Sequence, residues 1–223
     1  MPPARLVPRL QKLLPWSSSA QYWERRYARG GNSGKGSYGD LAAFKAGFLN
    51  GFVTQHGIAT LIEFGCGDGA QLARAQYPRY LGFDVSDTAL QWCRSMFAGD
   101  PRKTFRRAAD YAGEQADVAL SLDVIFHLLE DHTFEVYMRR LFFAAERFVV
   151  IYSSDFEQPA SRNAKHVRHR SFSAWAASNA PDFEETARLD NPYRARPAGV
   201  DLPTTQSIFA VYRRIAPRRP PPW

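Results

Sequence analysis

Residues 61–69 constrain what this chain can fold into more than any other stretch. They read Leu-Ile-Glu-Phe-Gly-Cys-Gly-Asp-Gly, so an apolar run that carries Glu63 ends in three alternating glycines. Only glycine allows so tight a turn after a strand together with so close an approach of a ligand to the backbone. Good helix formers follow at 70–75. A strand, a glycine loop and a helix in this order are typical of a nucleotide-binding unit.

A second acid lies at a suitable distance along the chain. Residues 80–85, Tyr-Leu-Gly-Phe-Asp-Val, indicate the next strand, and Asp84 stands near its carboxyl end. In nucleotide-binding units, a carboxylate about 20 residues after the glycines binds the ribose diol. Ser86 and Asp87 follow, so Asp84 could also be no more than an acid at the start of a helix. Its place at the end of a strand favours the binding role.

Both segments resemble motifs I and II of the class I S-adenosylmethionine-dependent methyltransferases. The matching residues are 63–69, Glu-Phe-Gly-Cys-Gly-Asp-Gly, and 82–86, Gly-Phe-Asp-Val-Ser. Residues 109–111, Ala-Asp-Tyr, are similar to the adenine-binding turn that follows strand 3 in that family. Residues 116–128 are similar to its strand 4 and the loop beyond. The resemblance covers residues 55–155 and concerns the cofactor, with little bearing on the methyl acceptor.

The resemblance implies S-adenosylmethionine as the cofactor. It implies that Glu63 orients the amino-acid end, that the glycines lie against the methionine part, and that Asp84 accepts hydrogen bonds from the ribose hydroxyls. Asp110 would accept one from the adenine amino group, although aspartate is also a common turn residue. Tyr111 would either flank the adenine or pack in the core. The domain residues predicted to bind the cofactor are Glu63, Gly65, Cys66, Gly67, Asp68, Gly69, Asp84, Val85, Asp110, Tyr111 and Ser121.

An aromatic and glycine-rich leader precedes this unit. Residues 20–29 suit a short helix and residues 30–39 a loop. In the resembled family such a leader often folds over the cofactor, so we expect residues 20–54 to form a lid that touches the methionine carboxylate. A helix packed on the sheet edge, with a surface loop, is the alternative. The lid would add three aromatic side chains to the cofactor-binding set, namely Tyr22, Trp23 and Tyr38.

Past the leader, strands and helices alternate, which favours a parallel sheet with helices on both faces. Strands are predicted at 59–65, 79–85, 104–108, 117–122, 147–153, 182–190 and 206–214. Helices are predicted at 20–29, 40–55 with Asp40 as N-cap, 69–76, 86–97, 132–145 and 171–179. In the resembled family an antiparallel C-terminal hairpin closes a seven-stranded sheet. We therefore expect an α/β, Rossmann-like class I methyltransferase fold with a mostly parallel sheet.

Length and composition suit one domain. The chain has 223 residues, 45% of them hydrophobic, which is enough for one full core. We expect a loosely ordered basic arm at 1–19, the leader, the methyltransferase domain at 55–215 and a Pro/Arg-rich tail at 216–223. The two cysteines form neither a disulfide framework nor a metal-ligand spacing. No apolar run approaches about 18 residues and prolines interrupt the N-terminus, so we expect a cytoplasmic protein.

Candidate catalytic residues follow the predicted strand 4. Asp123 and His127 would lie beside the transferable methyl group, where an acceptor hydroxyl must be aligned and lose its proton. His166 and His169 are alternative bases among cationic residues that would keep a histidine neutral and attract an anionic acceptor. An unperturbed histidine would lose activity below about pH 6.5. Within the apolar run Phe-His-Leu, however, the sequence favours a structural role for His127.

The acceptor is the least determined part. Strand 4 ends Ser-Leu-Asp-Val and lacks the amino-methyltransferase signature of the family, so methylation through oxygen of a small molecule or sugar unit is favoured. A net charge of +7 and a pI of about 9.6 suit an anionic acceptor, and are compatible with nucleic acid, which is not favoured. No metal is expected, because Asp155 is followed by Phe156 and not by the asparagine of metal-dependent members.

Two other functional classes stay open. A nicotinamide-dependent oxidoreductase satisfies the glycine pattern taken alone. A binding module could keep the cofactor fold without turnover, and the basic composition permits such a role.

Overall fold

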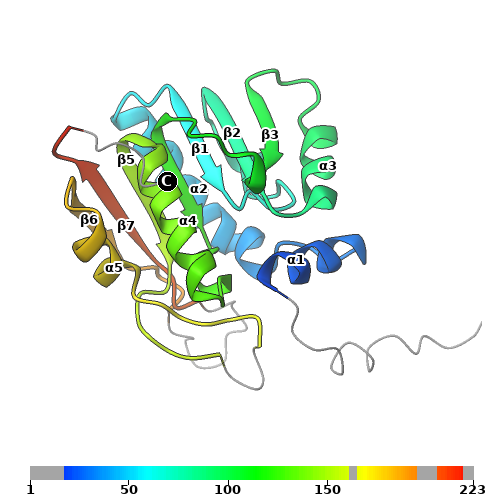
Figure 1. Cartoon of the computed structure of the whole chain (residues 1–223). Helices are drawn as coiled ribbons and strands as arrows, with labels where there is room; N and C mark the ends of the chain where they lie inside the picture. Colours follow the sequence, from blue (N-terminus) through cyan, green and yellow to red (C-terminus); the bar gives the residue numbers. More distant parts are fainter. Residues whose placement is uncertain (1–17, 161–164, 195–204, 218–223) are drawn as a thin grey trace, which may run out of the picture.

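A seven-stranded sheet forms the centre of the computed structural model, which describes residues 18–160, 165–194 and 205–217 (Figure 1). Most of the predicted arm and tail lies outside these residues. The strands are β1 Thr60–Phe64, β2 Arg79–Asp84, β3 Lys103–Arg107, β4 Ala116–Leu122, β5 Ala145–Ser153, β6 Phe183–Leu189 and β7 Ile208–Arg214. Each lies within two residues of its predicted range.

The strand order is β3-β2-β1-β4-β5-β7-β6. Strands β1 to β5 pair in parallel, and β7 is antiparallel to both of its neighbours, β5 and β6. The α-helices of the described residues are α1 Ser19–Ala28, α2 Gly39–Gln55, α3 Asp87–Met96, α4 Asp131–Ala144 and α5 Phe172–Asn179. A mostly parallel sheet with an antiparallel C-terminal pair confirms the predicted fold class.

The predicted helix at 69–76 is wrong. Only a 3-10 turn, Leu72–Arg74, follows the glycine loop before β2 begins at Arg79. Pro78 precedes β2 directly and disfavours a helical conformation at Tyr77. The connection that remains is too short to repay the nucleation of an α-helix.

The start of α2 also differs from the prediction. Its N-cap is Tyr38, which makes no side-chain capping bond, and the helix begins at Gly39. Asp40, predicted as the N-cap, lies one residue inside the first turn. Its negative charge there still suits the positive end of the helix dipole.

Buried side chains form a cluster on each face of the sheet. Ile62 and Phe64 belong to the cluster that includes residues of α4 and α5, whereas Leu61 belongs to the cluster that includes residues of α2 and α3. Successive side chains of a strand point to opposite faces, so a strand covered on both sides needs an uninterrupted apolar run. The adjacent apolar residues Leu61 and Ile62 of β1 point to opposite faces and therefore indicate helices on both.

Strand β1 is the point where the strand order reverses, because β2 and β4 lie on its two sides. In open α/β sheets, ligands bind in the crevice beyond the carboxyl ends of the strands at such a point. Helix α1 lies beyond this end of the sheet and packs against α3 (Figure 1). The fold thus brings the leader to the glycine loop.

Candidate active site

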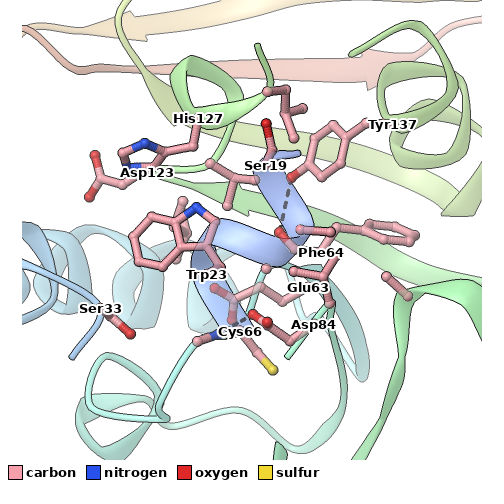
Figure 2. Close-up of a pocket in the computed structure, with 18 of the residues that line it drawn as sticks. Ser19, Trp23, Ser33, Glu63, Phe64, Cys66, Asp84, Asp123, His127 and Tyr137 are labelled. Carbon is pink, nitrogen blue, oxygen red and sulfur yellow. Dashed lines mark hydrogen bonds between the residues drawn. The ribbon is translucent and has the colours of Figure 1, made fainter. Parts of the chain in front are cut away.

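A cavity of about 370 Å³ lies at the carboxyl ends of β1, β2 and β4 (Figure 2). Pockets for small organic ligands measure about 300–1,000 Å³. Its walls come from the glycine loop, the segment after β4, one face of α4 and the leader helices α1 and α2. The predicted residues that line it are Trp23, Glu63, Gly65, Cys66, Gly67, Asp84, Val85, Asp123 and His127.

The glycine loop has left-handed backbone at Gly65 and Gly67, with φ of +87° and +58°. A Cβ on Gly65 would lie 2.4 Å from a Val124 methyl group, and one on Gly67 would lie 2.4 Å from Ser33 Oγ. Val124 follows β4, and Ser33 belongs to the leader. Glycine is therefore required here by the turn and by the protein's own close contacts, and both residues still line the cavity.

The Asp84 carboxylate is buried beside the glycine loop. The Gly67 N–H donates to Oδ2 at 2.8 Å and the Ser86 N–H donates to Oδ1 at 2.9 Å. A carboxylate has about four acceptor positions, so these hydrogen bonds leave it able to accept a further one from a ligand. Burial raises the pKa of Asp84 to about 6, although the N–H donors act to lower it. Two neighbouring hydroxyl groups are a ligand that this carboxylate can bind.

Glu63 is a second buried carboxylate of the cavity. The Tyr80 hydroxyl donates to its Oε2 at 2.6 Å. Burial raises the pKa of Glu63 to about 7, while the Tyr80 hydroxyl and the charge of Lys45 act to lower it. A cationic ligand group nearby would stabilise the ionised form of such a carboxylate.

Helix α1 covers the cavity and is fixed at its first residue and at its middle. Ser19 donates to the Glu130 carboxylate through its N–H at 3.0 Å and its hydroxyl at 2.7 Å, and the Thr88 hydroxyl donates to Glu24 at 2.7 Å. Glu130 is the N-cap of α4 and Thr88 lies in the first turn of α3. Helix α1 is therefore bound to the N-termini of α4 and α3, and its Trp23 lines the cavity (Figure 2).

The loop after α1 is bound to the glycine loop through Asp68. The Ser33 N–H and the Tyr38 hydroxyl donate to Asp68 Oδ2 at 2.8 and 2.6 Å. The Asp68 N–H donates to Ser33 Oγ at 3.0 Å. Asp68 and Tyr38, both predicted to bind the cofactor, thus bind each other, and neither lines the cavity. Their contacts hold the leader over the glycine loop.

His127 presents one ring nitrogen to the protein. Its Nδ1 lies 2.9 Å from the His166 carbonyl oxygen, so Nδ1 must carry the proton and Nε2 is the basic nitrogen of the neutral ring. Burial lowers the pKa of His127 to about 4. The Trp23 ring meets the imidazole edge-on, with 4.8 Å between ring centroids. His127 is thus a neutral base on the cavity wall, held by one hydrogen bond.

Asp123 lies beside His127 but is already paired. Its Oδ2 lies 2.7 Å from Lys45 Nζ, and the Ser207 hydroxyl donates to its Oδ1 at 3.0 Å. Its φ of +58° is left-handed, which is uncommon for a residue other than glycine. Both oxygens of this carboxylate are already engaged by a lysine and a hydroxyl, so the geometry favours His127 over Asp123 as a base.

The other two candidate histidines do not line the cavity. The His166 ring stacks on Tyr22 and His127, with centroid distances of 5.0 and 5.6 Å. His169 Nδ1 lies 2.6 Å from Ser154 Oγ. Burial lowers the pKa of both histidines. His166 therefore packs against His127, whereas His169 contacts Ser154 outside the cavity lining.

Three of the cationic residues near these histidines are paired with acids. Arg168 and Arg170 both contact Asp131, at 2.8 and 2.7 Å, and Arg188 contacts Asp155 at 2.8 Å. Arg170 is buried as well. The pairing reduces the attraction that this run of charge would exert on an anionic acceptor.

Five more of the predicted cofactor residues lie outside the cavity lining, namely Tyr22, Gly69, Asp110, Tyr111 and Ser121. Tyr111 packs edge-on against two core phenylalanines. Ser121 is buried and accepts a hydrogen bond at 2.7 Å from the hydroxyl of Tyr137, which does line the cavity. Asp110 is exposed, and a Cβ on Gly69 would contact a cysteine and a phenylalanine of the protein.

Lys45 and Gln71 are among the polar residues of the cavity that were not predicted. Lys45 is 1% exposed and lies on the buried face of α2, four residues from Leu41 and from Leu49. A lysine at a core position of a helical period is a signal that the sequence does carry. Gln71 offers no such signal, because its burial depends on how the leader packs against the turn at Leu72–Arg74.

The central segment, residues 62–142, matches the family model described as "Methyltransferase domain". The N-methyltransferase NodS from Bradyrhizobium japonicum WM9, solved with S-adenosyl-L-homocysteine, has a similar fold, with a TM-score of 0.64 and 14% identity over 89% of this chain and 99% of NodS. Residues 62–142 are thus similar to a methyltransferase domain, and the chain has the fold of the class I methyltransferases. Their cofactor is S-adenosylmethionine.

Other solved structures share this fold. Magnesium protoporphyrin IX methyltransferase (ChlM) from Synechocystis PCC 6803, with bound S-adenosyl-L-homocysteine, has a TM-score of 0.60 and 14% identity over 88% of this chain and 98% of ChlM. The methyltransferase domain of bacterial CtHen1 has a TM-score of 0.58 and 17% identity over 77% of this chain and 97% of that domain. The sequence matches none of the curated proteins.

The described part of the protein bears on two kinds of partner, a membrane and a metal ion. None of its helices there combines the length and the hydrophobicity needed to cross a membrane. Within the same residues, His, Cys, Asp and Glu side chains nowhere form a group of three that could hold a metal ion.

Proposed function

We propose that this methyltransferase binds S-adenosylmethionine in the cavity and methylates an oxygen of a small-molecule or sugar acceptor. The observation that carries the binding site is Asp84, a buried carboxylate at the end of β2 that lines the cavity and can accept a further hydrogen bond. A second observation agrees with it. Gln71 Oε1 is a buried acceptor in the same cavity without a partner among the described residues, so the protein leaves a polar position for a ligand to fill.

The residues divide into a cofactor end and an acceptor end. Asp84 would accept hydrogen bonds from the ribose hydroxyls, and Glu63 would face the positively charged part of the ligand. S-adenosylmethionine supplies a methyl group on a sulfonium sulfur. Trp23 and the leader would exclude water, which strengthens electrostatic contacts inside the site. His127 Nε2 would take the proton of the acceptor hydroxyl, which supports transfer to oxygen.

Asp84→Ala is expected to weaken the binding of S-adenosylhomocysteine about tenfold to a hundredfold. The substitution removes a charged acceptor, and hydrogen bonds to charged groups contribute about 1.5–3 kcal/mol. Isothermal titration calorimetry measures the affinity. Asp87→Ala is the matched control, because Asp87 lies three residues further on, pairs with Arg107 and does not line the cavity. Equal affinities of Asp84→Ala and the parent protein would remove Asp84 from the site.

Saturating S-adenosylhomocysteine is expected to slow proteolysis of the leader loop at residues 30–39. A ligand against Trp23 and Ser33 would add contacts that keep the loop closed, and binding to the closed state shifts the equilibrium toward it. Limited proteolysis with and without ligand measures the effect. The Asp84→Ala protein at the same ligand concentration is the control and should lose the protection. Identical cleavage rates in the parent protein would make residues 30–39 a surface loop without a lid function.

A screen with methyl-labelled S-adenosylmethionine against pooled metabolites and glycans tests the acceptor class. Label recovered as an ether or ester of a small molecule or glycan would support the proposal, and label on nitrogen would replace oxygen as the acceptor atom. Cofactor binding without label transfer to any pool would favour the binding module. The oxidoreductase alternative loses support, because the family model matches a methyltransferase domain.

A further inference from the structure

Gln71 has a buried oxygen that the protein leaves without a hydrogen bond. The side chain lines the cavity directly after the glycine loop, and the residue is 8% exposed. Its Nε2 donates to the Ala42 carbonyl oxygen of α2 at 3.2 Å. Its Oε1 has no partner among the described residues.

The contact with Ala42 fixes the orientation of the amide. A carbonyl oxygen only accepts hydrogen bonds, so the group that faces it must be the NH₂ of Gln71. The other amide atom of Gln71 is then the oxygen, Oε1. The cavity therefore contains a hydrogen-bond acceptor in a fixed position, and the ligand that completes it must be a donor.

The charges nearby favour a cationic donor. Glu63, Asp84 and Asp123 are the carboxylates that line this cavity, together with Lys45. Lys45 lies 2.7 Å from Asp123, so that pair is balanced. Glu63 has only the neutral Tyr80 hydroxyl as its hydrogen-bond partner among the described residues. An ammonium group would satisfy Gln71 Oε1 and neutralise Glu63 at the same time.

We infer that Gln71 Oε1 accepts a hydrogen bond from the α-ammonium group of the bound cofactor, beside the Glu63 carboxylate. This inference rests on the proposed function. Gln71 would thus select ligands that carry the intact amino-acid end of the cofactor. Its side chain follows the glycine loop and is held in place by the hydrogen bond to Ala42 of the leader. A buried acceptor that stays unsatisfied is unfavourable, so adenosine thioethers without an amino group are rejected.

Calorimetry with three ligands tests this role. The ligands are S-adenosylhomocysteine, its analogue without the α-amino group, and 5′-methylthioadenosine, which lacks the whole amino-acid end. The parent protein should bind S-adenosylhomocysteine at least about tenfold more tightly than the deamino analogue. Gln71→Met should weaken S-adenosylhomocysteine about tenfold and leave the other two ligands unchanged. Gln71→Glu keeps an acceptor oxygen and should retain the preference for the amino group.

Gln76→Met is the matched control, since Gln76 is exposed in the same connection. Thermal unfolding of each variant establishes that it is folded, and the ligand comparison on the parent protein needs no substitution. Equal affinity of the parent protein for S-adenosylhomocysteine and the deamino analogue would overturn the inference, as would an equal loss for all three ligands in Gln71→Met. Failure of the parent protein to bind any of the three would instead overturn the proposed function and this inference with it.

Discussion

Replacing His127 by alanine is expected to lower kcat for methyl transfer by about a hundredfold or more, because general-base catalysis contributes about 10²–10⁴-fold. The affinity for S-adenosylhomocysteine should stay nearly constant. His127 Nδ1 is held by the His166 carbonyl group, which leaves Nε2 as the base on the cavity wall. Steady-state kinetics with the acceptor found by the labelled screen measures kcat. The control is His169→Ala, which removes a histidine that does not line the cavity.

The pH dependence separates this base from an ordinary histidine. A base must be neutral to accept a proton, so activity is present above its pKa and is lost as the pH falls through it. An unperturbed histidine would give that loss near pH 6.5. Burial lowers the pKa of His127 to about 4, so kcat at saturating cofactor and acceptor should stay level from pH 7 to about 5 and fall only below that range. The value of kcat/KM for the cofactor would also depend on Asp84 and Glu63, because burial raises their pKa values to about 6 and about 7. A His127→Ala enzyme with the parent kcat would contradict the assignment.

Lys45→Met is expected to lower the free energy of unfolding by about 3–5 kcal/mol. The side chain of Lys45 is 1% exposed and that of Asp123 is 18% exposed, and they form a direct ion pair. Removing one partner of a buried pair leaves the other charge without compensation, which costs about 3–5 kcal/mol. Asp123 also has a left-handed backbone conformation, which is unfavourable for a residue other than glycine. Without Lys45, the side chain of Asp123 would keep only its hydrogen bond from Ser207 among the partners that the structure describes.

Urea unfolding of the two proteins measures this change as a shift in midpoint at constant slope. Lys35→Met is the matched control, because Lys35 is an exposed lysine of the same leader, and exposed substitutions usually change stability by less than about 0.5 kcal/mol. Adding Asp123→Asn to Lys45→Met should recover part of the loss, since it removes the unpaired charge. A loss below about 1 kcal/mol in Lys45→Met would mean that the pair contributes little to folding.

The sequence predicts the local parts of this fold well. The strands follow from apolar runs bounded by turn residues. The three glycines that follow β1 also indicate where the cavity lies. The helix after the glycine loop fails, because good helix formers at 70–75 are overruled by Pro78 and the short connection to β2. Local propensity is a weak guide where the length of a connection decides the structure.

The contacts across the site could not be predicted, because they join distant segments. Lys45 and Asp123 are separated by 78 positions, and Ser33 and Asp68 by 35. The sequence indicates Asp123 as a candidate base, yet only the fold shows that this carboxylate forms an ion pair with Lys45. It likewise marks Asp68 as a ligand of the cofactor, whereas the fold directs that carboxylate to Ser33 and Tyr38.

The most direct test of the central claim is calorimetry of the parent protein with S-adenosylhomocysteine and with NAD. The site geometry predicts one molecule of S-adenosylhomocysteine bound per chain, with the affinity reduced in Asp84→Ala and unchanged in Asp87→Ala. It predicts no comparable binding of NAD. Binding of NAD in place of S-adenosylhomocysteine, or equal binding of S-adenosylhomocysteine by the parent protein and by Asp84→Ala, would contradict a methyltransferase site in this cavity.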